Sequence, residues 1–217
     1  LTVQMDTFGR TLEQAEPYLC EEAEPQIVMN ADWQALQSRQ PHLSKDDAEY
    51  ISTGQFFYNK LLRHSGFLLH SSAVVVDGKA YLFSAASGTG KSTHTQLWLD
   101  TFGDRAYMLN DDKPALRKED DRWYAYGTPW SGKTELNINI KKPLKAIFFV
   151  ERGEENAVEK MSVSDAVLNL SRQLPNPFYD KNIGIRTVKF IEKLYKYNVP
   201  VYRLKCSISQ DAVTAVY

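Results

Sequence analysis

The feature that most constrains this chain is the stretch from Tyr81 to Thr93, which reads Tyr-Leu-Phe-Ser-Ala-Ala-Ser-Gly-Thr-Gly-Lys-Ser-Thr. It begins as an apolar strand, passes through small residues and ends in Gly-Lys-Ser at the start of a predicted helix. Glycines let the backbone turn so that several N–H groups point at one anion, and a helix N-terminus adds its positive end. The stretch therefore predicts a phosphate-binding loop, formed by Ser87, Gly88, Thr89, Gly90, Lys91, Ser92 and Thr93.

Two residues of this loop have separate expected tasks. Lys91 is expected to reach the β- and γ-phosphates of a nucleotide, and the Ser92 hydroxyl is expected to bind Mg²⁺. Ala85 stands where the pattern has its first glycine, so only the relaxed form of the motif is met, and a purely structural turn is the alternative. The surroundings favour the phosphate loop, because apolar runs flank the Asp77-Gly78 turn signal and the second run leads into the loop.

An acidic pair follows the next predicted strand, Ala106–Leu109. Asp111 and Asp112 lie about one helix beyond the loop, where such folds hold Mg²⁺ and where a second carboxylate can accept a proton from an attacking hydroxyl. The alternative is an ordinary polar turn, since Asn-Asp-Asp is favoured turn chemistry. Together with the loop, the catalytic interpretation is the stronger one.

Other polar residues near strand ends have weaker signals. His70 opens the hairpin and, by itself, is best read as a half-buried histidine with a satisfied hydrogen bond. Lys133 and Arg152 are cations that phosphoryl transfer could use, although most loop lysines are simply solvated.

Composition narrows the class of protein. The chain has 217 residues, of which 43% are hydrophobic and 24% charged, and its formal net charge is -1. These values indicate a globular protein with a substantial core and give no reason to expect nucleic acid or a membrane as a partner. Cys20 and Cys206 are too few for a disulfide framework and lack metal-ligand spacing. No apolar run is long enough to span a bilayer and no leader pattern is visible, so a cytoplasmic protein is expected.

The element pattern predicts an α/β fold with a mixed, largely antiparallel sheet, flanking helices and a small helical or mixed N-terminal lobe. The expected division is residues 1–66 for the lobe and 67–217 for the catalytic domain. In the lobe, Pro25–Met29 reads as a short strand, and Ser44 with Asp47 forms a capping box that starts a helix. A break in that helix is expected at Thr53-Gly54. The apolar run Leu144–Glu151 predicts a strand covered on both faces.

The region from His70 to Asp112 resembles the C-terminal catalytic domain of HPr kinase/phosphorylase, a bacterial serine kinase related to phosphoenolpyruvate carboxykinases. In that family a histidine opens a hairpin, a Gly-rich loop ends in Gly-Lys-Ser, and a later strand ends in an Asp-Asp pair. The matching positions are His70, Gly78, Ser87, Gly88, Gly90, Lys91, Ser92, Asp111 and Asp112. The resemblance implies that Lys91 holds phosphate, Ser92 and Asp111 support Mg²⁺, Asp112 acts as base and His70 lies beside it.

This resemblance implies an ATP- and Mg²⁺-dependent kinase that phosphorylates a hydroxyl, in the first place serine, on a peptide, small protein or small molecule. The HPr-specific signature is not recognisable, which argues against HPr itself as the acceptor. Instead Tyr126–Lys133 resembles HPr-kinase-like proteins of unknown substrate, including lasso-peptide kinases. The alternatives are a carboxykinase-like enzyme and a nucleotide-binding sensor or accessory protein without activity. A homo-oligomer is compatible with the resemblance.

Overall fold

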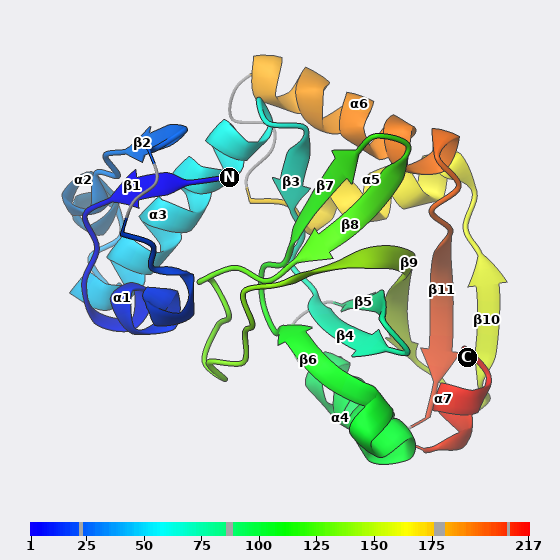
Figure 1. The fold of residues 1–217 in the computed structure, drawn as a ribbon. Helices are drawn as coiled ribbons and strands as arrows, with labels where there is room; N and C mark the ends of the chain where they lie inside the picture. Colours follow the sequence, from blue (N-terminus) through cyan, green and yellow to red (C-terminus); the bar gives the residue numbers. More distant parts are fainter. Residues whose placement is uncertain (22–23, 86–88, 176–180, 208) are drawn as a thin grey trace.

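The structure is a computed structural model that describes residues 1–21, 24–85, 89–175, 181–207 and 209–217. In this part of the chain, nine strands form one sheet (Figure 1). They are β3 (Gly66–Leu68), β4 (Ser72–Val76), β5 (Lys79–Ser84), β6 (Ala106–Asn110), β7 (Ala115–Glu119), β8 (Arg122–Tyr126), β9 (Lys141–Arg152), β10 (Ala157–Lys160) and β11 (Val201–Cys206). The strand order is β3-β7-β8-β9-β5-β4-β6, with β11 paired to β9 and β10 paired to β11.

The sheet is mixed and mostly antiparallel, as predicted. Its parallel pairs are the two that β9 makes with β5 and with β11, and the other strand pairs run antiparallel. The β9 strand contains the apolar run found in the sequence, and consecutive residues enter two different cores. Ile147 and Phe149 join one core, whereas Phe148 and Val150 join the other. The prediction of a strand covered on both faces is therefore confirmed.

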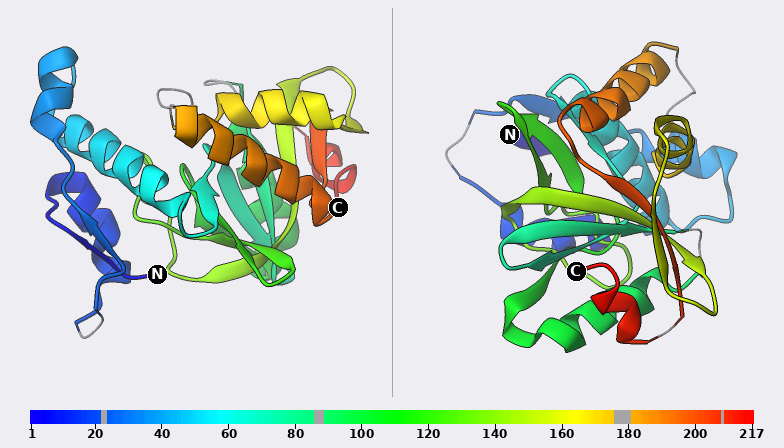
Figure 2. Two further views of the ribbon diagram at one scale, coloured as in Figure 1. Left: turned by 90° about the horizontal axis from the view of Figure 1, so that it is seen from above. Right: turned by 90° about the vertical axis from the view of Figure 1, so that its right-hand side faces the viewer.

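Helices cover both faces of the sheet. They are α4 (Lys91–Phe102), α5 (Val163–Arg172), α6 (Lys181–Lys196) and α7 (Asp211–Thr214), with a 3-10 turn over Gly103–Arg105 after α4. Residues of α5 and α6 pack into the core that contains Ile147, and residues of α4 and α7 pack into the core that contains Phe148. Figure 2 shows α5 and α6 on one side of the sheet, with α4 and α7 on the opposite side.

The N-terminal part forms a smaller mixed lobe at one side of the sheet (Figure 2). Its elements are β1 (Val3–Met5), α1 (Gly9–Ala15), a 3-10 turn over Glu16–Tyr18, β2 (Ile27–Met29), α2 (Trp33–Arg39) and α3 (Lys45–Leu61). The strand predicted over Pro25–Met29 is present as β2, which pairs in parallel with β1. The lobe is thus both helical and stranded.

The helix α3 connects the lobe to the sheet. It begins as predicted, because the Ser44 hydroxyl accepts a hydrogen bond from the Asp47 N–H at 3.0 Å. Tyr58 and Leu61 of α3 pack into the same core as Phe67 of β3. The division at residues 66 and 67 stays a prediction.

The predicted break at Thr53-Gly54 is wrong, because α3 continues through both residues. The indole of Trp130 explains the glycine: a Cβ on Gly54 would come within 3.2 Å of its Cδ1 atom. The Trp130 Nε1–H also donates to the Thr53 hydroxyl at 3.1 Å. Gly54 is therefore a site of close packing rather than a break in the helix.

Within the residues described, no helix is long and apolar enough to cross a membrane.

Candidate functional site

The predicted hairpin leads the chain to the segment predicted to bind phosphate. Asp77 and Gly78 turn β4 into β5 with φ values of 47° and 75°, the left-handed conformation that such a turn requires. The β5 strand is buried from Ala80 onward and ends at Ser84, one residue before Ala85. The predicted loop residues Ser87 and Gly88 lie outside the described residues.

The described part of the loop resumes at Thr89 and enters α4 through Gly90. Gly90 has φ 109°, a conformation that side chains other than hydrogen strongly disfavour, and Lys91 is the first residue of α4. The first bond within the helix runs from the His94 N–H to the Gly90 carbonyl at 2.9 Å. The N–H groups of the first helical turn before His94 therefore remain outside the helix bonding pattern, which is the arrangement that binds anions.

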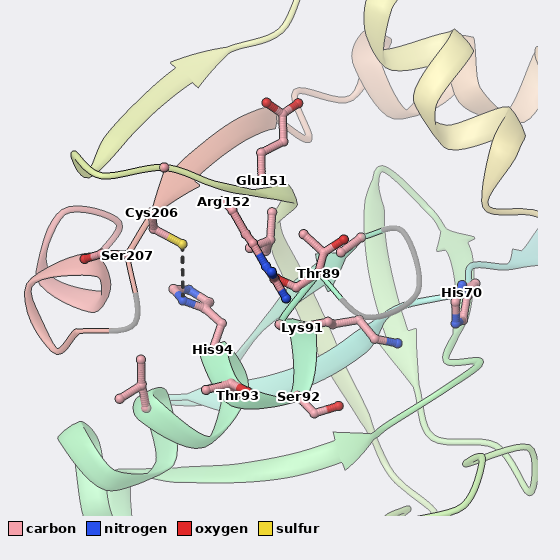
Figure 3. Close-up of a pocket in the computed structure, with 15 residues that line it drawn as sticks. His70, Thr89, Lys91, Ser92, Thr93, His94, Glu151, Arg152, Cys206 and Ser207 are labelled. Carbon is pink, nitrogen blue, oxygen red and sulfur yellow. Dashed lines mark hydrogen bonds between the residues drawn. The ribbon is translucent and has the colours of Figure 1, made fainter.

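A cavity of about 720 Å³ opens over this helix start (Figure 3). One wall is the loop and the first turn of α4, and the opposite wall is the end of β9 with the end of β11. The lining residues that Figure 3 labels are His70, Thr89, Lys91, Ser92, Thr93, His94, Glu151, Arg152, Cys206 and Ser207. The volume lies within the range of sites for small-molecule ligands.

Arg152 comes to this cavity from the end of β9. Its Nε–H donates to the Thr89 carbonyl at 3.4 Å, and Figure 3 shows its guanidinium over the loop. Of the two cations considered from the sequence, Arg152 thus lies at the loop. Lys133 does not line the cavity and is exposed; its charge instead helps to lower the pKa of Asp47, after the hydrogen bond from Ser44 and the charge of Arg10.

The acidic pair begins directly after β6. Asp111 is buried, and its Oδ1 accepts a hydrogen bond from the Ser72 hydroxyl. Its Oδ2 accepts no hydrogen bond from the residues that the structure describes. Asp112 differs, because its Oδ2 accepts the Tyr50 hydroxyl at 2.8 Å and also pairs with the Lys113 ammonium. The Asp112 Oδ1 lies 3.4 Å from the His70 Nε2.

His70 connects the acidic pair to the cavity. It lines the cavity, and its ring contacts Asp112. Gln173, just after α5, fixes the residue twice: the His70 N–H donates to the Gln173 carbonyl at 2.9 Å, and Nδ1 lies 3.0 Å from the Gln173 Oε1. The half-buried histidine expected from the sequence is therefore present, and its second nitrogen faces a carboxylate.

The charges of these groups influence one another. Burial lowers the pKa of Lys91, while the charges of Asp112 and Asp111 oppose this shift. Burial also lowers the pKa of His70, and the nearby Lys91 charge lowers it further. For Asp112, burial alone would raise the pKa, but the charge and hydrogen bond of Lys113 and the bond from Tyr50 leave the pKa below its usual value. Lys91, His70 and Asp112 thus form one electrostatic cluster.

The residue types present fit magnesium. Ser92 and Asp111 offer oxygen atoms, which Mg²⁺ prefers, and this ion usually takes one or two protein ligands and completes its shell with water and phosphate oxygens. The Oδ2 of Asp111 that accepts no hydrogen bond from described residues is a suitable donor. Within the described ranges, no group of three or more His, Cys, Asp or Glu side chains is arranged to hold a metal.

Several residues of the site carry no signal in the sequence. Tyr50 and Gln173 are 62 and 103 positions from the residues they contact. Each is a common residue type within a helix or just after one, so nothing in the sequence pattern separates it from its neighbours. Lys113 could have been found, because it follows the acidic pair directly.

Comparison with known proteins gives one family. A family described as SynChlorMet cassette protein ScmC matches residues 45–213. The chain belongs to this family. No curated protein matches. A solved structure similar to part of the chain is the Hpr(Ser) kinase/phosphatase from Coxiella burnetii, with 11% identity and a TM-score of 0.39 over 69% of this chain and 93% of that chain.

Proposed function

We propose that this ScmC-family protein is an ATP- and Mg²⁺-dependent kinase that transfers the γ-phosphate to a hydroxyl of a peptide, small protein or small molecule. The observation that carries the proposal is the electrostatic cluster of Lys91, His70 and Asp112 beside a cavity at the N-terminus of α4. A phosphate-binding element and a carboxylate that can accept the proton of the attacking hydroxyl both recur in enzymes that transfer phosphoryl groups. A serine hydroxyl is the first acceptor to test.

The first task of the site is to hold the triphosphate. The N–H groups at the start of α4 and the Lys91 ammonium would bind the β- and γ-phosphate oxygens, and Arg152 would add a second cation from the opposite wall. Mg²⁺, held through Ser92 and Asp111, would neutralise charge on these oxygens when it is bound. The apolar side chains of Leu97 and Val150, which also line the cavity, would contact the rest of the nucleotide.

The second task is to activate the acceptor. The acceptor oxygen attacks the γ-phosphorus, the bond to the β–γ bridging oxygen breaks, and ADP leaves with the electron pair of that bond. Asp112 would take the acceptor proton on Oδ1, because Oδ2 already accepts hydrogen bonds from Tyr50 and Lys113. His70 would stay beside Oδ1, and the burial that lowers its pKa disfavours the charged form that would neutralise the carboxylate.

A nucleotide-binding sensor is the second candidate. The observation in its favour is the pairing of Asp112 with Lys113, which weakens the carboxylate as a base. Such a protein would bind ATP at the same loop and release it unchanged.

One experiment separates these functions. ATP and Mg²⁺ binding is measured by calorimetry, and ADP formation and transfer of labelled phosphate to serine-containing peptides are measured in parallel, for wild type, Lys91→Ala and Asp112→Asn. A kinase should bind ATP in the micromolar range. Lys91→Ala should lose about 2 kcal/mol of binding free energy, as expected for charged hydrogen bonds. Asp112→Asn should keep binding and lose transfer.

Other outcomes count against the kinase. ATP binding with no turnover in wild type or Asp112→Asn would favour the sensor. No binding by wild type would mean that the loop is only structural.

A further inference from the structure

Tyr50 belongs to the N-terminal lobe, yet its hydroxyl lies in the site. It is 4% exposed on α3, and its O–H donates to the Asp112 Oδ2 at 2.8 Å. The Tyr50 hydroxyl oxygen in turn accepts a hydrogen bond from the Gly132 N–H at 2.8 Å. A tyrosine hydroxyl has one donor and two acceptor sites, so this single group ties a helix of the lobe to the acidic pair and to the loop after β8.

The loop that carries Gly132 lies directly on Asp112. Gly132 has φ 73°, and a Cβ there would be 3.1 Å from the Asp112 Cβ. A second lobe residue holds the same loop: the Gln14 amide donates to the Gly132 carbonyl at 2.8 Å and accepts the Ser131 N–H at 3.2 Å. The lobe therefore fixes both the carboxylate and the backbone against it.

The two oxygens of Asp112 consequently have different surroundings. Oδ2 accepts Tyr50 and Lys113, whereas Oδ1 faces His70, which lines the cavity. We infer that Tyr50 is a positioning residue that fixes the Asp112 carboxylate with Oδ1 toward the cavity, so that the N-terminal lobe completes the site. This inference rests on the proposed kinase function.

Lys113 alone does not explain the orientation. Its ammonium is a compact charge on a flexible side chain, so it can keep the ion pair while the carboxylate rotates and does not fix which oxygen faces the cavity. The Tyr50 ring is rigid and enclosed: the Arg10 guanidinium lies 4.1 Å from its centroid and the Lys113 ammonium 4.7 Å. Burial also raises the pKa of Tyr50, so the hydroxyl stays protonated and remains a donor.

The test compares Tyr50→Phe with a matched variant on the same helix. Tyr58 is also fully buried, and its hydroxyl bonds the Thr187 hydroxyl at 2.7 Å, so Tyr58→Phe removes a similar bond away from Asp112. Gln14→Ala is the third variant, because it loosens the loop and leaves the Asp112 contacts in place. ATP·Mg²⁺ affinity, thermal midpoint, and kcat and KM for ADP formation with water as acceptor are measured for each full-length protein.

The inference predicts a selective effect on turnover. Tyr50→Phe should lower kcat by about tenfold or more, as expected when a proton-accepting group is misplaced. Its ATP affinity should stay within about twofold of wild type, because the phosphate loop is unchanged. Tyr58→Phe and Gln14→Ala should keep kcat within about threefold of the wild-type value, even if their thermal midpoints fall as far as that of Tyr50→Phe.

The failures can be told apart. If wild type turns over but Tyr50→Phe matches Tyr58→Phe, Tyr50 has only a structural role and the inference is overturned. If kcat falls as much in Gln14→Ala as in Tyr50→Phe, the lobe acts by positioning the loop that carries Gly132 and not the Asp112 carboxylate. The inference is then also overturned. If wild type binds ATP without turnover, the kinase function fails and the inference fails with it.

Discussion

His94 is a histidine whose surroundings exclude the charged form. It is buried in the second turn of α4, its Nε2 accepts the Trp98 indole N–H at 3.1 Å, and its ring packs edge-on against Phe83. Because an indole N–H can only donate, Nε2 must be the acceptor and Nδ1 must carry the proton. Nδ1 faces the Cys206 sulfur at 3.9 Å (Figure 3). Burial lowers the pKa of His94 to about 4.

This histidine should make stability depend on pH. Between pH 6.5 and 4 the unfolded chain binds a proton at His94 and the folded chain does not, so acid favours unfolding. The contribution is complete above pH 6.5 and is lost as the pH falls toward 4. Between pH 7 and pH 5 the loss should be about 2 kcal/mol of unfolding free energy. Urea unfolding at both pH values measures it.

The control for this measurement is His94→Gln, which keeps a polar side chain but has no site that titrates in this range. The difference in pH dependence between wild type and variant isolates the histidine from the carboxylates. An equal dependence in both proteins would contradict the assignment.

At the scale of elements, α3 shows how packing can override intrinsic preference. Alanine is favoured over glycine in a helix by about 1 kcal/mol, so Gly54→Ala would ordinarily stabilise α3. Here the added methyl meets Trp130, which stacks on Phe57 with ring centroids 4.9 Å apart and is held by its bond to Thr53. We expect Gly54→Ala to lower the unfolding free energy by about 1 kcal/mol or more, because overpacking typically costs 1–3 kcal/mol.

Urea unfolding of a double variant checks the reason. In a Trp130→Phe background the same glycine replacement should be neutral or stabilising, because the smaller ring leaves room for the methyl. A stabilising Gly54→Ala in the wild-type background would show that the indole can move aside.

The elements near the loop were predictable because their signals are local. The Asp77-Gly78 hairpin, the strand before Ala85 and the acidic pair after β6 are fixed by neighbours in the sequence, and the structure has them where they were expected. The prediction of a helix break is wrong because the residue that explains Gly54, Trp130, is 76 positions away in the sequence. Short β10 was not expected because all its residues are exposed and show no apolar alternation.

The site followed the same rule. The contact of His70 with Asp112 is expected only from the family resemblance, whereas Tyr50 and Gln173 reach the site through the tertiary fold, which no local pattern predicts. Lys133 shows the limit of a local signal: it is a cation in a suitable loop sequence, but it is exposed and does not line the cavity, so its role stays a prediction.

At the scale of the whole molecule, a buried carboxylate joins the first residues to α3. Glu49 is 1% exposed, and its two oxygens accept hydrogen bonds from the hydroxyls of Thr7 and Thr11. Removing one donor leaves a buried charged oxygen without a partner, which costs about 2–3 kcal/mol. Thr11→Val should therefore lower the unfolding free energy by this amount and speed proteolysis of residues 1–21.

The chain offers a matched control for this prediction. The Thr101 hydroxyl is buried and has no hydrogen-bond partner among the described residues. Thr101→Val should therefore leave the unfolding free energy unchanged or raise it slightly. An equal decrease of the unfolding free energy in the two variants would mean that the hydrogen bond of the Thr11 hydroxyl to Glu49 contributes nothing to stability. Chemical denaturation and timed trypsin digestion measure both effects.

The position of β9 also has a consequence for synthesis on the ribosome. Besides the nearby strand β8, it pairs with two strands that are distant in the sequence: Leu82 of β5 lies opposite Ile147, and so does Val201 of β11. The hairpins β4–β5 and β7–β8 can form as soon as they emerge, but β9 gains β11 as a partner only after residues 201–206 have been translated. Since distant strand pairings form slowly, the wall of the cavity that carries Arg152 should be the last part of the site to assemble.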